Sequence, residues 1–228
     1  HLLEVIGDGG SAAARFSTPY PQGDAATRLT QPVLLARASL LLLDWLTTGR
    51  GEAPPSAIVT NDWLAALTAP YAHHTSWAGG HASSGIREIA RSSLFIHLIH
   101  NLEAGYDGRL QLPDNAGRPN MLAALHQLPS RLLHTMGSDD GLHLTRAALL
   151  CSHGWGTVAP SYKMELLSSS SSTIYAPLLR QFGSAAIACD SGLPLSSRRE
   201  DLNAYGDHSS AKAALQRMCF GEHGVNKD

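Results

Sequence analysis

The sequence predicts an α/β fold built on a Rossmann-like parallel sheet with helices on both faces. Short apolar and β-branched runs alternate along the chain with longer stretches whose apolar residues recur at helical spacing. Strands separated by helices of this length imply parallel pairing, because each helix returns the chain to the same edge of the sheet. With 228 residues, 43% of them hydrophobic, the chain can bury the core that such a fold needs.

The first half of the chain is predicted to carry two strands and two principal helices. Residues 1–6, "HLLEVI", form a possible strand, and residues 25–48 have apolar side chains at helical spacing, with Pro32 near the first turns. "AIVTN" at 57–61 reads as a short buried strand that leads into a helix over 62–72. After a glycine-rich loop and a short helix, "SLFIHLIHN" at 93–101 is a second β-type run.

The second half continues the alternation. Strands are predicted at 156–160 and 184–189, with helices at 161–167 and 176–182 between them. The five serines Ser168 to Ser172 are interpreted as a low-complexity loop without chemistry. "DSGLPLSSRRED" has the composition of a domain end, and a further helix is expected over 209–221.

Composition excludes several classes of partner. A formal net charge of -2 provides no field that would attract nucleic acid or an acidic membrane surface. The longest apolar run is interrupted by Arg37 and Asp44, so no membrane span is expected. The three cysteines are widely spaced and form no C-x-x-C pair, which favours a reducing compartment. The chain begins with His1 and shows no targeting segment, so we expect the natural N-terminus to lie upstream.

Two polar residues stand at the predicted carboxyl ends of different strands, where α/β folds bind ligands. Asp62 follows the strand 57–61, and His100 closes the run at 93–101. Each has a structural alternative: Asp62 could cap the following helix, and His100 could be a buried histidine bonded to backbone. His97 should point to the opposite face and be structural. His73 and His74 are adjacent rather than four residues apart, and no metal-ligand spacing occurs, so no metal is expected.

Five segments together resemble the N-terminal domain of bacterial and plant glycogen and starch synthases, the glycosyltransferase family 5 type. In chain order they are "TNDWLAALTAPYAHH", "IHLIHNLEAGYDGRL", "HQLPSRLL", "GWGTVAPSYKMELL" and "CDSGLP". The family's pattern has a strand into Asp-Trp, a strand into His-Asn followed by a glycine, a Gln-Leu-Pro, and a Thr-Val-x-Pro-x-Tyr helix start. The resemblance runs from about Pro19 to Cys219.

The resemblance implies the N-terminal half of a GT-B glycosyltransferase. Residues 1–206 would be an incomplete acceptor-side Rossmann-like domain, and residues 207–228 a helix and tail leading toward a C-terminal nucleotide-binding domain. The implied activity is transfer of glucose from UDP-glucose or ADP-glucose to the non-reducing end of an α-1,4-glucan, with no other cofactor, in the cytoplasm or a plastid.

The resemblance also implies roles for individual residues. Asp62 and His100 match the family's catalytic-pocket residues, and Tyr20, Asn101 and Ser191 match substrate-binding positions, with Asn101 as support for its loop. Where the family has Asn-Gly, this chain has Ser191-Gly192, and the stretch between His100 and Gly108 is longer than the family's.

Other features depart from the family or favour a different function. The family's Lys-x-Gly-Gly loop is missing, and Gly7, Gly9 and Gly10 are interpreted as a surface turn. Because the nucleotide-binding domain is also missing, we expect the fragment alone to be inactive. The alternative function is a non-catalytic glucan-binding or interaction module with a Rossmann-like shell. An α/β hydrolase is disfavoured because no G-x-S-x-G elbow occurs.

Overall fold

The computed structural model describes residues 23–74, 83–111, 122, 126–138, 141–188 and 207–220. The chain divides into two compact units, His1–Cys189 and Asp190–Asp228. From the second unit the structure describes α12 (His208–Phe220), which matches the helix expected over 209–221. The predicted strand at 1–6 and the predicted glycine turn at 7–10 lie outside the described residues.

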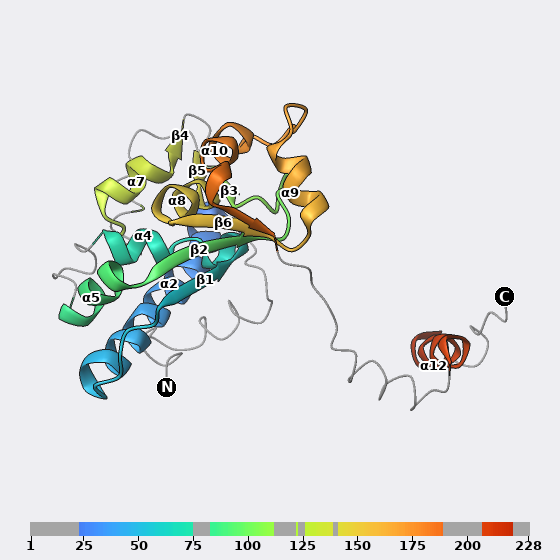
Figure 1. The fold of residues 1–228 in the computed structure, drawn as a ribbon, viewed down its shortest axis with the longest axis horizontal. Helices are drawn as coiled ribbons and strands as arrows, with labels where there is room; N and C mark the ends of the chain where they lie inside the picture. The colour runs from blue at the N-terminus through green and yellow to red at the C-terminus, as the bar shows by residue number, and fades with distance from the viewer. Residues whose placement is uncertain are drawn as a thin grey trace. The chain divides into compact units, whose positions relative to one another are not determined.

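Four parallel strands form the main sheet of the first unit. They are β1 (Ala57–Asn61), β2 (Leu94–Ile99), β6 (Gly154–Thr157) and β7 (Ala186–Ala188). Their order in space, β1-β2-β6-β7, is their order along the chain (Figure 1). The predicted α/β fold with a parallel sheet is confirmed. Strand β6 spans 154–157 rather than 156–160, because Pro160 already begins the next helix.

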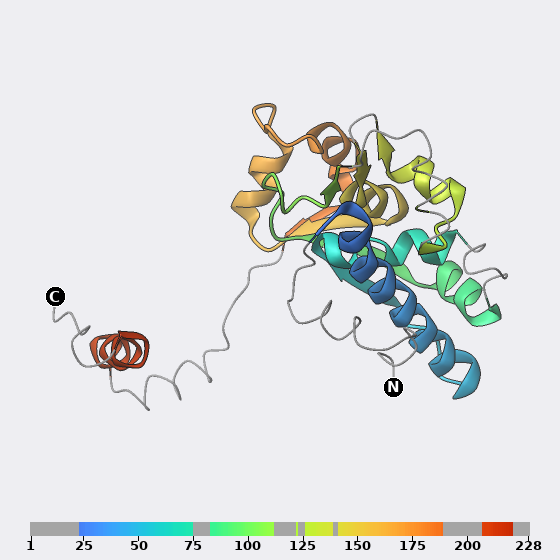
Figure 2. The same cartoon turned by 180° about the vertical axis from the view of Figure 1, so that it is seen from behind.

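The strand order explains where the helices lie. Because each new strand is added on the same side of the sheet, right-handed crossovers carry the connecting helices to one face. On that face Phe95 and Trp155 are almost completely buried, and Figure 2 shows the helices in front of it. On the other face, 54% of Val59 and 53% of Leu94 are exposed. The described helices therefore form one of the two predicted layers, and the prediction that "AIVTN" is fully buried is wrong, because one face of β1 is exposed.

The long helix α2 (Ala25–Asp44) corresponds to the prediction over 25–48 and continues into a π-helical turn at Trp45–Gly49. The side chain of Asp24 starts the helix by accepting a 2.8 Å hydrogen bond from the backbone N–H of Thr27. Pro32 lies inside the helix, whereas the sequence predicted it near the first turns.

The segment Ala25–Gly49 is the one stretch of the described chain whose length and composition would allow it to cross a membrane. The charged residues Arg37 and Asp44 are too few to exclude a membrane span on composition, which the sequence had been expected to do. In the structure, however, Leu29 and Leu40 have no exposed surface, because they pack into the core of the first unit. One face of the helix therefore packs into the core, while Leu35, Leu41 and Leu42 are 46%, 50% and 48% exposed.

The helix expected over 62–72 is divided in two. Helix α3 (Asp62–Ala65) ends before α4 (Thr68–His73) begins. Pro70 lies in the first turn of α4, where the missing N–H costs little, whereas inside one continuous helix it would remove a backbone hydrogen bond. The short helix predicted before β2 is α5 (Ser84–Ser92), and the Ser83 side chain caps it.

The rest of the first unit contains elements that the sequence analysis did not find. Strands of two or three residues form a small antiparallel sheet in the order β3-β5-β4, and they are too short to show a periodic pattern. Its strands are β3 (Arg109–Leu110), β4 (Gly137–Ser138) and β5 (Gly141–His143). The remaining helices are α7 (Ser130–Met136), α8 (Leu144–Cys151), α9 (Pro160–Leu167), α10 (Ala176–Gln181) and the 3-10 turn η2 (Gly183–Ala185). Of these, α9 and α10 match predicted helices.

Candidate functional site

Asp62 and His100 meet at the carboxyl edge of the parallel sheet. Asp62 directly follows β1, and His100 directly follows the neighbouring strand β2. The backbone N–H of His100 donates a 2.8 Å hydrogen bond to Oδ1 of Asp62, across 38 positions of sequence. The structure therefore brings these two residues together at this edge of the sheet.

Asp62 has a backbone conformation that is unusual for a residue with a side chain. Its φ is +50°, in the left-handed region, which costs on the order of 1–3 kcal/mol and occurs often at functional sites. Its second oxygen, Oδ2, accepts a 3.2 Å hydrogen bond from the hydroxyl of Tyr106. The capping alternative is wrong, because Asn61 occupies the capping position and both oxygens of the Asp62 carboxylate bond to the loop that follows β2.

The His100 side chain is exposed, so the alternative of a buried histidine is also wrong. Its Nε2 lies 3.1 Å from Oδ1 of Asn61, the last residue of β1. Since a carbonyl oxygen accepts, this contact assigns the proton to Nε2 and leaves Nδ1 as an acceptor. No described residue hydrogen-bonds to Nδ1, which could therefore receive a ligand hydroxyl.

The loop after His100 is held in place by its own hydrogen bonds. Oδ1 of Asn101 accepts a 2.7 Å bond from the N–H of Glu103, so Asn101 supports the loop. The N–H of Leu102 donates to the hydroxyl of Tyr162 on α9 at 3.0 Å. Gly108 closes the loop with φ +78°, and a Cβ there would stand 2.6 Å from Cβ of Trp63. Only glycine lets the loop approach the residue next to Asp62 this closely.

Asp107 anchors the end of the same loop in the core. Its carboxylate accepts a 2.9 Å bond from Nε of Arg109, and its side chain is 3% exposed. Its carbonyl oxygen accepts from the hydroxyls of Thr145, at 2.8 Å, and Tyr175, at 2.9 Å. The loop that carries Tyr106 to Asp62 is thus fixed at both ends, which preorganises the carboxylate.

Burial and the nearby carboxylates raise the pKa of the Tyr162 hydroxyl. Burial is the largest cause that raises the pKa of its hydroxyl; the Leu102 hydrogen bond lowers it, and the carboxylates of Glu165, Asp62 and Glu103 raise it further. The hydroxyl therefore remains a hydrogen-bond donor at neutral pH.

Comparison with known proteins identifies the family. Residues 10–181 match the family described as the starch synthase catalytic domain, and this stretch includes all the site residues placed above. The chain belongs to this family. No curated protein matches the chain significantly.

A solved structure shows the same fold: the catalytic domain of starch synthase IV from Arabidopsis thaliana, bound to ADP and acarbose. The two sequences are 20% identical, the TM-score is 0.57, and the similarity covers 80% of this chain and 33% of that chain. The chain thus spans about a third of the length of that starch synthase. The likeness shows that this chain shares the α/β fold of part of that catalytic domain.

Within the starch synthase family domain, the predicted site residues divide into two groups. The structure brings together Asp62, His100 and Asn101, whereas Tyr20 and Ser191 lie outside the described residues. Sequence reasoning missed Asn61, Tyr106 and Tyr162. The sequence could have indicated Asn61 as a site residue, since it ends a strand immediately before Asp62. The two tyrosines had none, because their contacts span 44 and 60 positions.

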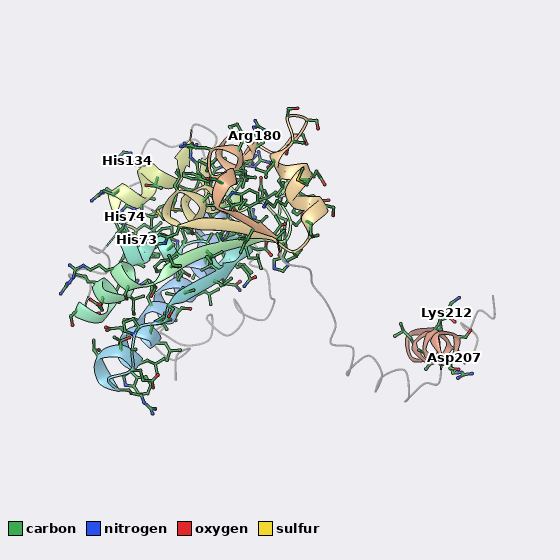
Figure 3. All side chains as sticks on the ribbon, viewed as in Figure 1. His73, His74, His134, Arg180, Asp207 and Lys212 are labelled. Carbon is green, nitrogen blue, oxygen red and sulfur yellow. The ribbon has the colours of Figure 1, made fainter. Side chains whose placement is uncertain are left out.

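The histidines of α4 and α7 lie away from this site. His73 packs its ring against Phe95 at the start of β2, at the opposite end of the strand from His100, with ring centroids 5.0 Å apart. Figure 3 shows His73, His74 and His134 on this side of the unit. In the described part of the chain, no three His, Cys, Asp or Glu side chains form a cluster that could hold a metal ion.

Proposed function

We propose that this chain forms the acceptor-side wall of a retaining glucosyltransferase of the starch and glycogen synthase type. The reaction would transfer glucose from ADP-glucose or UDP-glucose to the non-reducing end of an α-1,4-glucan. The observation that carries the proposal is the Asp62–His100 hydrogen bond at the carboxyl edge of the sheet, in a chain of the starch synthase family. The nucleotide sugar is a substrate, and the proposal requires no cofactor or metal.

The geometry suits the charge that develops in this reaction. Cleavage of the bond between the anomeric carbon and the phosphate passes through an oxocarbenium-like state, which a nearby carboxylate stabilises. Asp62 supplies that carboxylate, held by His100 and Tyr106. His100 keeps Nδ1 available for a sugar hydroxyl while Nε2 donates to Asn61. Its role is therefore to orient the glucose unit, not to act as a general base.

The chain alone should not catalyse transfer. In the proposed reaction, the diphosphate of the donor needs cationic partners, and the reacting sugar needs a second wall that excludes water. The sequence lacks the family's Lys-x-Gly-Gly loop, and the chain spans about a third of the starch synthase chain it resembles. We therefore expect glucan synthesis from a protein that contains this acceptor-side wall together with the second wall.

The test is glucose transfer to glycogen by an intact enzyme that contains this chain, with ADP-glucose and UDP-glucose compared as donors. Asp62→Asn should lower turnover by well over tenfold, because asparagine tolerates the left-handed backbone but carries no charge. His100→Ala should do the same. Glu88→Gln, an exposed change on α5, is the control and should retain the wild-type rate. Wild-type rates in both site variants would refute the assignment and favour a non-catalytic glucan-binding module.

A further inference from the structure

A cavity of about 460 Å³ opens between the first turn of α8 and the segment that runs from Ile174 into α10. The volume lies within the roughly 300–1,000 Å³ that is typical of small-molecule sites. Its described lining includes none of the residues that surround Asp62 and His100, so the proposed reaction does not use it. Its own side chains therefore determine what it can bind.

Two buried rings line the cavity. His143 is 4% exposed and Tyr175 is 2% exposed, and their rings pack edge to face with centroids 6.1 Å apart. The Tyr175 hydroxyl donates a 2.9 Å hydrogen bond to the carbonyl of Asp107, and Nδ1 of His143 lies 3.5 Å from the same hydroxyl. Because the Tyr175 hydroxyl is already engaged, this part of the lining offers a ligand mainly the carbon surface of two fixed rings.

Aliphatic side chains form much of the remaining lining. They are those of Ile174, Pro177 and Leu178, and 48% of Ile174 is exposed. An apolar group that covers these side chains removes their surface from water, which favours binding. The lining therefore selects a ligand with an apolar body, and a flat aromatic ring suits the two rings that are already there.

Arg146 on α8 gives the cavity its charge. Among the described residues that line the cavity, it is the one with a permanent charge, and none is acidic. Its side chain is exposed and makes no hydrogen bond or ion pair within the described part of the chain. Arg180 on α10 differs, because its Nη1 donates a 3.0 Å bond to the carbonyl of Ser168 (Figure 3). The guanidinium of Arg146 is therefore available to a ligand.

The surroundings of Arg146 favour an anion as its partner. A guanidinium presents a planar set of N–H donors that matches the oxygens of a phosphate or a carboxylate. His143 directly precedes α8, so the cavity lies beside the amino end of that helix, which carries a partial positive charge. The carboxylate of Asp107, the residue bonded to Tyr175, is itself paired with Arg109 at 2.9 Å, which reduces its repulsion of an anion. Gln181, also in the lining, can donate a further hydrogen bond through its amide.

We propose that this cavity binds a small molecule that joins an aromatic ring to an anionic oxygen group, as in an aryl phosphate or an aryl carboxylate. The ring packs against His143, Tyr175 and the aliphatic side chains, and the anionic group pairs with Arg146. This inference goes beyond the proposed function and does not rest on it, because it follows from the side chains of the cavity alone.

The test is direct binding of phenyl phosphate, benzoate, phenol and inorganic phosphate to the chain, measured by NMR shifts and titration calorimetry, which requires no catalytic activity. We expect phenyl phosphate or benzoate to bind with a dissociation constant of about 1 mM, a modest affinity for a ligand of this size. Phenol lacks the anion and inorganic phosphate lacks the ring, so both should bind more weakly. Whichever of the two aryl anions binds more tightly identifies the anionic group, and either order supports the site.

Variants separate the contribution of Arg146 from that of the fold. Arg146→Ala should weaken binding of the preferred aryl anion about tenfold, because a charge-assisted contact is lost. Arg91→Ala is the matched control, since Arg91 is also exposed on a helix, α5, and does not line the cavity. Gln181→Glu, which preserves the shape of an exposed side chain, should weaken binding of the anion and leave binding of phenol unchanged.

Three results would overturn this binding site. They are the absence of saturable binding of both aryl anions to the wild-type chain, equal affinities of Arg146→Ala and Arg91→Ala, and binding of phenol or inorganic phosphate as tight as that of the aryl anions. Each of these leaves the proposed function standing, because glucose transfer by the intact enzyme tests that separately.

Discussion

The middle of the sheet and its carboxyl edge each bring a histidine close to a polar side chain of β1. In the middle, Nδ1 of His97 lies 3.0 Å from the hydroxyl of Thr60, and His97 has no exposed surface. At the edge, Nε2 of His100 lies 3.1 Å from Oδ1 of Asn61, and His100 is exposed. The two contacts resemble each other in chemistry and in length.

The difference in burial gives these two histidine contacts different effects on protonation and on access to solvent. Burial lowers the pKa of His97 to about 4, so that it is neutral and serves the packing of the sheet. His100 can exchange its contacts with water or a ligand, and its backbone N–H holds Asp62. We therefore expect His97 to serve stability and His100 to serve the proposed chemistry, and the following predictions test that difference.

The largest effect is expected in the middle of the sheet. His97→Ala should lower the free energy of unfolding by about 3 kcal/mol, because it leaves a cavity and removes one of the two partners of the buried Thr60 hydroxyl, the other being the carbonyl of Ile96. Urea unfolding monitored by tryptophan fluorescence measures this loss. His134→Ala, an exposed change on α7, is the control and should be nearly neutral. A loss below about 0.5 kcal/mol for His97→Ala would contradict the structural role of this histidine.

Acid should destabilise the fold through the same residue. The pKa of His97 is about 4 in the folded chain against 6.5 in the unfolded one, so the unfolded state takes up the proton first as the pH falls. The contribution of neutral His97 to the free energy of unfolding is greatest above about pH 6.5. It decreases as the pH falls to 4, by at most about 3 kcal/mol. Burial also lowers the pKa of His73 and His74, which adds in the same direction.

Unfolding free energies measured at several pH values test this prediction. His97→Phe should flatten the decrease between pH 6.5 and pH 4, because phenylalanine takes up no proton. An unchanged slope in that variant would show that another group causes the acid sensitivity.

At the carboxyl edge, a smaller effect should appear in catalysis. Tyr106→Phe removes one of the two hydrogen bonds to Asp62 and should lower kcat/KM of the intact enzyme by about fivefold, or roughly 1 kcal/mol. Tyr71→Phe is the control, since that buried hydroxyl contacts the carbonyl of His126, outside the site. Equal rates for both variants would remove Tyr106 from the site.

The smallest effect on stability is expected for the exposed histidine at the carboxyl edge. His100→Ala should change the free energy of unfolding by less than about 0.5 kcal/mol, because the side chain is exposed and its backbone N–H remains bonded to Asp62. The same urea titration used for His97→Ala measures it. A loss comparable with that of His97→Ala would mean that the edge contact is structural.

Local pattern was enough to predict the α/β class, the four parallel strands and the placement of Asp62 and His100 at strand ends. Alternating apolar runs and helical spacing depend on nearby residues, and parallel strands end at a common edge whatever their order. The same local reasoning failed where packing decides. It treated residues 57–61 as fully buried and residues 62–72 as one helix, and it missed the small antiparallel sheet.

Only the tertiary structure decided which strands are neighbours and which side chains complete the site. The order β1-β2-β6-β7 places β1 next to β2 and sets Asn61 and Asp62 beside His100. Tyr106 and Tyr162 reach the site from a loop and from α9, through contacts that no local propensity encodes. A sequence specifies its elements through short-range periodicity, whereas the partners of a polar side chain depend on long-range packing, which forms only when those elements assemble.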